Sequence, residues 1–174
     1  DARVAAPGED SISYQAPWNP AGKEAMKSSF GQKWYAEGLR FECQRCGACC
    51  TGEPGYVWVT PSESARIAEF LRLSLREFAR KYLRKAGSHD SLTEHPDGRC
   101  IFFAKNGCAI YSVRPMQCRT FPFWRSVLVS PEAWRRCGEE CCGMGKGRLY
   151  SAGEIEEILR LTRRGSAGPE WHPR

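Results

Sequence analysis

Residues 41–50 read FECQRCGACC, and they bring four cysteines, Cys43, Cys46, Cys49 and Cys50, into one short segment. In a C-x2-C pair, a tight turn points two thiolates at one ion and leaves backbone N–H groups free to bond the sulfurs. Gly47 directly follows Cys46 and supplies the backbone freedom that such a turn needs. The segment therefore predicts metal ligation at a turn.

The chain has ten cysteines among its 174 residues, which is more than one mononuclear site can use. The six outside the segment 41–50 are Cys100, Cys108, Cys118, Cys137, Cys141 and Cys142. Adjacent cysteines tend to project in different directions, so we expect Cys49 and Cys50 to bind different metals unless one of them bridges. The same expectation applies to Cys141 and Cys142. Count and spacing together predict two metal sites or one polynuclear site.

A disulfide scaffold is the competing interpretation of so many thiols. Disulfide-dense domains are usually small and secreted, whereas 174 residues are enough to bury a core. We see no secretory segment at the start of the chain. An adjacent pair such as Cys49–Cys50 could form only a strained ring disulfide. We therefore expect metal ligation in a reducing compartment, the cytoplasm.

The spacing leaves iron and zinc both open as the metal. Cys43, Cys46 and Cys49 match the first three ligands of the bacterial ferredoxin spacing C-x2-C-x2-C-x3-C-P. Pro54 is in register, but Glu53 stands at the fourth cysteine position, so a cluster would take its fourth thiolate from elsewhere. Zinc sites more often use C-x2-C pairs separated by a longer loop. An all-cysteine ligand set fits either metal, with a slight preference for an Fe–S cluster such as [4Fe–4S].

The charge pattern indicates which kinds of binding partner the protein favours. Lys and Arg total 26 against 20 Asp and Glu, which gives a formal net charge of +6. The basic residues are scattered, and two four-thiolate sites of charge −2 each would offset much of the excess. The pattern gives little support to nucleic-acid binding and leaves room for a protein or acidic partner. No stretch reaches the roughly 18 apolar residues of a membrane span.

Helix signals occur throughout the rest of the chain. The pairs Thr60–Glu63 and Ser74–Glu77 form capping boxes, which predict two helices. Ser130 and Ser151 are expected to begin two further helices. Residues 21–40 are expected to form a broken helix.

Strand and turn signals are fewer. Asn106-Gly107 predicts a β-hairpin that carries Cys100 and Cys108. The segment 56–59 is expected to be a short strand. The glycine-rich run 143–148 lacks the GxxxxGK[ST] pattern of a phosphate-binding loop, so we expect a turn there.

These elements predict an α+β fold, a single small domain of short helices and a β-hairpin organised around cysteine-ligated metal sites. Residues 1–40 are expected to form an N-terminal arm that is partly disordered or helical. Residues 41–164 would be the cysteine-cluster metal-binding domain, and residues 165–174 a flexible tail.

Few residues other than cysteine suggest a role at the metal. His89 and His95 are expected in a surface loop, since no ligand spacing frames them. Arg114 and Arg119 flank a cysteine, and their expected role is to screen its negative charge. The aromatic segment 121–124 is expected to be buried as a lid over a metal site.

Four blocks in order resemble the YkgJ-type cysteine-cluster proteins, which carry the zinc- or iron-chelating CxxCxxCC domain. They are FECQRCGACC at 41–50, the GxVxVT-like GYVWVT at 55–60 before a capped helix, CIFFAKNGCAIYSVRPMQCRTFPFW at 100–124 and CCGMGKGR at 141–148. The resemblance covers about residues 41–160. It implies eight metal ligands at Cys43, Cys46, Cys49, Cys50, Cys100, Cys108, Cys118 and Cys142. On this alignment, Cys137 and Cys141 look like additions peculiar to this chain.

Three functions remain open at this point. The first is a metal-binding protein with an Fe–S cluster that acts in redox chemistry or supports a modification reaction. The second is a zinc-stabilised module that binds a protein or an acidic partner. The third is a metal-dependent enzyme. The sequence does not decide whether the protein is an enzyme, and the identity of the metal would separate the first two functions.

Overall fold

The computed structural model describes residues 33–51, 54–105 and 107–165, and all ten cysteines lie within these ranges. The arm expected over residues 1–20, the first part of the broken helix expected over 21–40, and residues 166–174 of the expected tail lie outside the described residues. The boundaries of the three predicted regions stay predictions.

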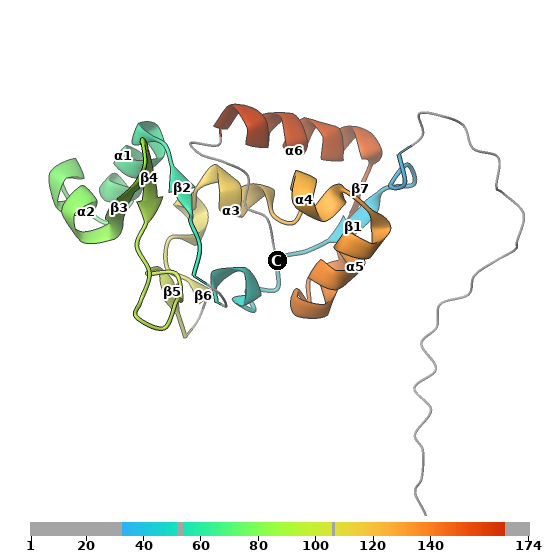
Figure 1. The fold of residues 1–174 in the computed structure, drawn as a ribbon, viewed down its shortest axis with the longest axis horizontal. Coiled ribbons are helices and arrows are strands. Elements are labelled where there is room, and N and C mark those ends of the chain that lie inside the picture. The colour runs from blue at the N-terminus through green and yellow to red at the C-terminus, as the bar shows by residue number, and fades with distance from the viewer. Residues whose placement is uncertain (1–32, 52–53, 106, 166–174) are drawn as a thin grey trace, which may run out of the picture. The chain divides into compact units, whose positions relative to one another are not determined.

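Short helices make up much of the described chain (Figure 1). The α-helices are α1 (Pro61–Phe70), α2 (Leu75–Tyr82), α3 (Met116–Thr120), α4 (Arg125–Leu128), α5 (Pro131–Glu140) and α6 (Ala152–Gly165). Two 3-10 turns are η1 (Ala48–Cys50) and η2 (Tyr111–Val113). No helix in the described part of the chain is both long and apolar enough to cross a membrane.

The helix starts follow the predicted capping signals. Both predicted capping boxes, Thr60–Glu63 and Ser74–Glu77, are formed. In each, the hydroxyl oxygen accepts the glutamate N–H, and the glutamate carboxylate accepts the N–H of the capping residue. Ser130 accepts a hydrogen bond from the Ala133 N–H at the start of α5, and Ser151 exchanges hydrogen bonds with Glu154 at the start of α6. Each cap satisfies backbone N–H groups that the first helical turn leaves without partners.

The strands form three small antiparallel sheets. The first pairs β1 (Leu39–Phe41) with β7 (Met144–Tyr150), and the second has the order β2-β4-β3. The third is the hairpin of β5 (Phe103–Ala104) and β6 (Gly107–Cys108). The strands of the second sheet are β2 (Trp58–Val59), β3 (Leu83–Ala86) and β4 (His89–Leu92). The architecture is α+β, as predicted.

Three local predictions were wrong, and long-range pairing explains two of them. Residues 33–40 form a turn and the start of β1 instead of a helix, and 143–148 belong mostly to β7 instead of a turn. The glycine-rich segment has no strand-like apolar alternation at its start, and it becomes a strand because β1 lies beside it. His89 lies in β4 rather than in a loop, because Gly87 with φ +61° closes a tight β3–β4 hairpin.

Two apolar clusters flank the cysteines. One joins α1, α2 and β4 to the β5–β6 hairpin around Ile67, Phe78 and Ile110. The other joins β1, α4 and α6 around Phe123 and Ile155. Figure 1 shows η1 between the β5–β6 hairpin and α5, so the CxxCxxCC segment lies between elements of both clusters.

Candidate metal centre

The CxxCxxCC segment turns sharply at Gly47. Gly47 has φ +83°, a left-handed conformation that L side chains rarely adopt, and it begins η1. Its carbonyl oxygen accepts hydrogen bonds from the Cys50 N–H at 2.8 Å and from the Thr51 hydroxyl at 3.1 Å. A Cβ atom at Gly47 would lie 2.2 Å from the Phe103 ring. Glycine is therefore needed both for the turn and for the approach of the β5–β6 hairpin.

Cys49 and Cys50 lie closer together than the sequence led us to expect. Their Sγ atoms are 3.8 Å apart, although adjacent cysteines were expected to project in different directions. The 3-10 geometry of η1 is the reason, because it turns the backbone between them. The hydrogen bond from the Cys50 thiol lowers the pKa of Cys49 to about 7 and raises the pKa of Cys50 far above its usual range. The pair therefore holds one thiolate near neutral pH.

A backbone hydrogen bond brings Cys100 next to the Cys49–Cys50 pair. The Cys100 N–H donates a hydrogen bond to the Cys50 carbonyl oxygen at 2.8 Å, and Cys100 pairs with Glu94 in an isolated bridge. Cys108 follows in β6, opposite Phe103. The predicted hairpin exists and carries Cys108, but Cys100 lies before β5 and pairs with Glu94 instead. Its register pairs Ala104 with Gly107, so Gly107 belongs to a strand rather than to the turn.

Cys118 is carried by α3, which two polar residues fix in place. The Glu63 carboxylate accepts the Met116 N–H at 2.6 Å while it also caps α1. The Gln117 side chain accepts the Trp58 N–H and donates to the Tyr56 carbonyl oxygen. These bonds tie the helix of Cys118 to α1 and β2, so the position of this thiol depends on elements far away in the sequence.

Two sets of thiols can be named, although the charge of Cys49 acts on members of both. Burial raises the pKa of Cys100, Cys108 and Cys118, and the negative charge of Cys49 raises each of them further. Cys43 acts in the same way on Cys108. We call this set the central group, and its members are Cys43, Cys49, Cys50, Cys100, Cys108 and Cys118.

The remaining four thiols form a second set. Cys46 shares a side-chain hydrogen bond with Cys142, and its pKa is lowered first by the Ala48 N–H and then by that bond. Burial raises the pKa of Cys141, and the charges of Cys46, Cys49 and Cys142 add to the effect. Burial raises the pKa of Cys137 to about 12, and the charges of Cys141, Glu140 and Cys49 add to the effect. We call these four residues the lateral group, and its members are Cys46, Cys137, Cys141 and Cys142.

Backbone N–H groups bond several of the sulfurs with the same spacing. In four cases the donor lies two residues after the cysteine and lowers its pKa. The pairs are Cys46–Ala48, Cys100–Phe102, Cys108–Ile110 and Cys141–Gly143. Such N–H···S bonds stabilise a thiolate over a thiol, which is the form that binds metal. The backbone around both groups therefore suits metal–thiolate bonding.

Arg114 is a basic residue whose positive charge acts on three thiols of the central group. Its positive charge lowers the pKa of Cys49, Cys108 and Cys118 against the stronger effect of burial on the last two. The guanidinium stacks on the Tyr111 ring at 3.8 Å, and Arg45 lies on the same ring at 4.4 Å. Arg114 therefore takes the screening role that the sequence suggested, whereas no contact of Arg119 with a sulfur is among those described.

A cavity of about 1430 Å³ opens beside the thiols. Its lining includes six cysteines, which are Cys49, Cys50, Cys100, Cys118, Cys137 and Cys141. Phe121 and Trp124 also line it, while Phe123 between them is buried in the second apolar cluster. The aromatic segment is therefore mostly buried beside the cysteines, in line with the expected lid.

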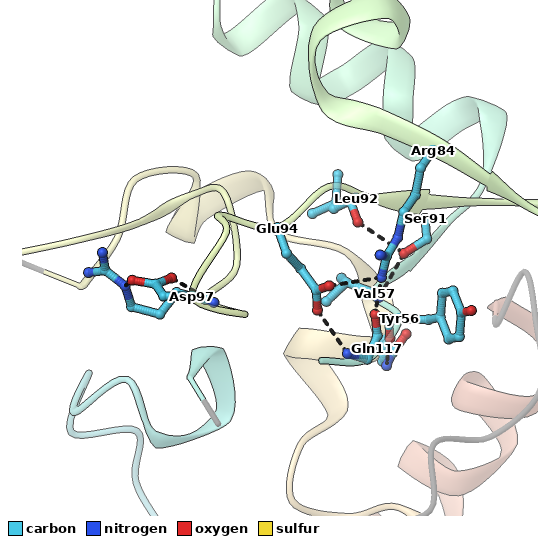
Figure 2. Close-up of polar contacts among 10 residues, drawn as sticks. Tyr56, Val57, Arg84, Ser91, Leu92, Glu94, Asp97 and Gln117 are labelled. Atoms are coloured by element: carbon cyan, nitrogen blue, oxygen red, sulfur yellow. Dashed lines mark hydrogen bonds and ion pairs between the residues drawn. The ribbon is translucent and has the colours of Figure 1, made fainter. Parts of the chain in front are cut away.

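Figure 2 shows a half-buried ion pair, Arg84–Glu94, beside the cavity wall. Arg84 contacts Glu94 at 3.0 Å, donates to the Gly55 carbonyl oxygen, and lies over the Tyr56 ring at 4.8 Å. Glu94 also accepts the Gly55 N–H at 2.8 Å. The pair thus links β3, the chain after the CxxCxxCC segment, and the strand bridge that positions Cys100.

The donor set fits a metal–thiolate site in its chemistry. All ten cysteines, each within the described ranges, are free thiols without a disulfide. As the side chains stand, no three His, Cys, Asp or Glu residues of the described chain surround one point closely enough to hold a metal ion. Metal sites commonly complete their geometry only on binding. The thiols that line the cavity, their N–H donors and their counter-charge are the parts of such a site that the chain supplies by itself.

Comparison with known proteins agrees with this chemistry. The uncharacterized protein MJ0661 of Methanocaldococcus jannaschii is 33% identical over 91 residues, which cover 51% of this chain and 48% of that protein. The chain thus spans about half the length of this relative. No solved structure matches.

Residues 42–142, which contain all ten cysteines, match the family described as "CxxCxxCC: Putative zinc- or iron-chelating domain". The matched range is more than half of the chain and supports metal binding in general. It begins at the CxxCxxCC segment and ends at Cys142, so it includes both thiol groups. The chain belongs to this CxxCxxCC family.

Proposed function

We propose that the chain binds an Fe–S cluster through thiolates of the central group and acts in redox chemistry or in support of a modification reaction. The observation that carries this proposal is that Cys49, Cys50, Cys100 and Cys118 line one cavity and act on one another's charge. These thiols come from three separate segments of the chain. The ligands are taken from the eight cysteines that the family resemblance implies.

An Fe–S cluster would supply reversible one-electron transfer at this place. The chain's own residues would set its conditions. Backbone N–H groups of Phe102 and Ile110 stabilise thiolate sulfur, and Arg114 offsets negative charge. Phe121 and Trp124 limit access of water along the cavity. These three influences are the ones by which a protein adjusts a cluster potential.

Zinc bound by the same thiols is the second candidate, and one distance favours it. Two sulfurs that share a tetrahedral zinc with Zn–S bonds of about 2.3 Å lie about 3.8 Å apart. The Sγ atoms of Cys49 and Cys50 have this separation. A zinc centre would make the protein a metal-stabilised module for a protein or acidic partner. Because zinc has no redox chemistry, the two candidates differ in a single measurable property.

The compartment that suits either centre is a reducing one. Ten free thiols, several of them exposed, would oxidise outside the cytoplasm. We therefore place the protein in the cytoplasm as part of the proposal.

The test is metal analysis of the full chain purified without oxygen, together with acid-labile sulfide and the visible absorption spectrum. The proposal expects iron and sulfide in equal amounts and a broad sulfur-to-iron band. Stoichiometric zinc in a colourless sample would replace the first candidate by the second. A sample that binds neither metal after reduction would overturn both.

A pair of variants on one helix connects the metal to the central group. Cys118→Ser is expected to remove most of the bound iron, or of the zinc. Thr120→Ser, two residues away on α3, keeps a hydroxyl for its bonds to the Met116 and Gln117 carbonyl oxygens, and it is expected to keep the metal. Equal metal content in both variants would exclude Cys118 as a ligand.

A further inference from the structure

Two arginines rest on one tyrosine ring beside the CxxCxxCC segment. The guanidinium carbon of Arg114 lies 3.8 Å from the centroid of the Tyr111 ring, and that of Arg45 lies 4.4 Å from it. At most about 8 Å therefore separates the two positive charges, which repel one another. Arg45 belongs to the CxxCxxCC segment, whereas Tyr111 begins η2 and Arg114 directly follows it. Two distant segments thus bring like charges together on one ring.

The stacked guanidinium groups keep hydrogen-bond donors available. A guanidinium that lies on a ring uses its face, while its five N–H donors point outward in its own plane. Arg114 uses one of them, because its Nη1 donates to the Tyr111 carbonyl oxygen at 2.7 Å. Within the part of the chain that the structure describes, neither Arg45 nor Arg114 forms an ion pair with a carboxylate. Glu42, the acidic residue closest to Arg45 in the sequence, lies against Gly147 of β7 instead.

The backbone of Arg45 is held in a strained conformation. Its φ is +54°, in the left-handed region that residues with a Cβ atom rarely adopt. Gly107 of β6 packs against it, since a Cβ atom at Gly107 would lie 3.3 Å from the Arg45 Cβ. Strain of this kind persists only where the surrounding structure imposes it, and it is concentrated at functional sites. The β5–β6 hairpin and the Tyr111 ring therefore hold Arg45 in place together.

The surface around this ring is basic and borders exposed thiols. Arg45 is exposed and lies between Cys43 and Cys46, which are exposed as well. Lys105 follows β5 in the hairpin that contacts Arg45, and it is also exposed. We call this set the basic surface, and its members are Arg45, Lys105, Tyr111 and Arg114.

We propose that the basic surface docks an acidic protein partner, whose carboxylates bind Arg45 and Arg114. The planar N–H edge of a guanidinium can hold both oxygens of one carboxylate. Tyrosine and arginine are enriched among the residues that dominate binding at protein interfaces, and a guanidinium already held on a ring loses little freedom on binding. Single-stranded nucleic acid is favoured less, because its bases stack on open aromatic rings and Tyr111 already carries two guanidinium groups.

The proposal deepens the proposed function by giving the chemistry of a partner and the place where it docks. It rests on the proposed function only in that the partner would cover exposed thiols of a metal-binding segment. It holds for either metal, because the contacts it names involve no sulfur.

The test measures binding of fluorescent poly-L-glutamate to the reduced full chain at low and at high salt. Binding is expected at low salt and should weaken at high salt, where exposed charges are screened. Tyr111→Leu keeps both arginines but removes the ring that orders them, and it is expected to weaken binding about five-fold. Tyr111→Phe keeps the ring and is the matched control, which should bind like the original chain.

A second pair of variants separates the basic surface from the net charge. Arg45→Gln/Arg114→Gln is expected to weaken binding by more than about ten-fold, since two arginine–carboxylate contacts are lost. Arg66→Gln/Arg76→Gln removes two exposed arginines of α1 and α2 and lowers the net charge equally. This control is expected to stay within about two-fold of the original chain.

Several outcomes would overturn the docking surface. They are no binding of poly-L-glutamate at low salt, equal losses in the two double variants, or equal binding by Tyr111→Leu and Tyr111→Phe. Tighter binding of single-stranded poly-U with the same dependence on Tyr111 would assign the surface to nucleic acid and also overturn the proposal. Should Arg45→Gln/Arg114→Gln not fold by circular dichroism, Arg45→Gln alone is compared with Arg66→Gln, and a larger loss in Arg45→Gln is again required.

Metal analysis of the same samples separates this inference from the proposed function. An original chain that binds metal but shows none of these losses would leave the proposed function standing and exclude the docking surface. An original chain that binds poly-L-glutamate through Arg45 and Arg114 but takes up no metal would exclude the proposed function alone.

Discussion

The Cys100 backbone N–H donates a hydrogen bond to the Cys50 carbonyl oxygen, with 2.8 Å between nitrogen and oxygen. This bond joins the end of the CxxCxxCC segment to a residue about fifty positions later. The two thiols therefore belong to segments that share backbone hydrogen bonding as well as a cavity. Changes that separate these segments should disturb metal binding even when no cysteine is altered.

Gly47→Ala is expected to destabilise the protein by about 2–5 kcal/mol. A left-handed conformation costs alanine about 1–2 kcal/mol, and overpacking against the Phe103 ring adds about 1–3 kcal/mol. Gly87→Ala is the matched control, since Gly87 also has positive φ but no atom within 4 Å of the new Cβ. Urea unfolding of both variants measures the difference. Equal losses would mean that the contact with Phe103 has no effect.

Glu94→Ala is expected to cost about 2 kcal/mol and to weaken metal retention. The change leaves the Gly55 N–H and the Arg84 guanidinium without their partner in a pair that is only 17% exposed at Glu94 and 37% at Arg84. Asp97→Ala removes the exposed pair with Arg99 nearby and should cost much less. Unfolding curves and metal content, measured together, check both expectations. A larger effect from Asp97→Ala would contradict the structural role assigned to Glu94.

Alkylation of the metal-free, reduced chain should distinguish Cys49 from Cys137. The pKa of Cys49 is lowered to about 7 by the Cys50 thiol, so its thiolate fraction and its reaction with iodoacetamide should rise between pH 6 and pH 8. The pKa of Cys137 is raised by burial to about 12, so this thiol should react slowly throughout that range. Mass spectrometry of the labelled peptides gives both rates. A Cys49 rate that increases only above pH 8.5 would contradict the lowered pKa, and Cys50→Ala, which removes the donor, should shift the rise to higher pH.

Arg114→Gln is expected to lower the reduction potential of a cluster in the central group. A reduced cluster carries one more negative charge, and Arg114 stabilises negative charge on Cys49, Cys108 and Cys118. Charges about 10 Å apart at an effective dielectric constant of about 30 interact by about 1 kcal/mol, or about 40 mV for a one-electron couple. Potentiometric titration measures the change, with Arg119→Gln as the control. An unchanged or higher potential in Arg114→Gln would show that the screening is absent.

Local signals made much of the fold predictable. The capping boxes at Thr60 and Ser74 specify helix starts through bonds between residues three apart, so the sequence contains all the information they need. The α+β class, the β5–β6 hairpin and the metal-binding character of the CxxCxxCC segment follow from patterns of the same short range. The screening role of Arg114 was also visible from its place near a cysteine.

Contacts between distant segments were not predictable in this way. Strand β7 exists because β1 lies beside it, and its glycine-rich sequence resembles a turn when considered alone. Cys137 and Cys141 were set aside because they fell outside the resemblance, whereas α5 directs both to the cavity. The helical spacing of four residues, followed directly by Cys142, was the available signal for these two thiols. The closeness of Cys49 and Cys50 needed the actual backbone of η1.

The β1–β7 ladder also sets an order of events during synthesis. A ribosome makes the CxxCxxCC segment first, and Cys142 follows about 90 residues later. At about 5–20 residues per second, the early thiols wait roughly 5–20 s before their distant partners emerge. During that interval they are open to oxidation and to capture of the wrong ion. Completion of any metal site that takes a ligand from Cys142 would therefore be one of the last steps of maturation.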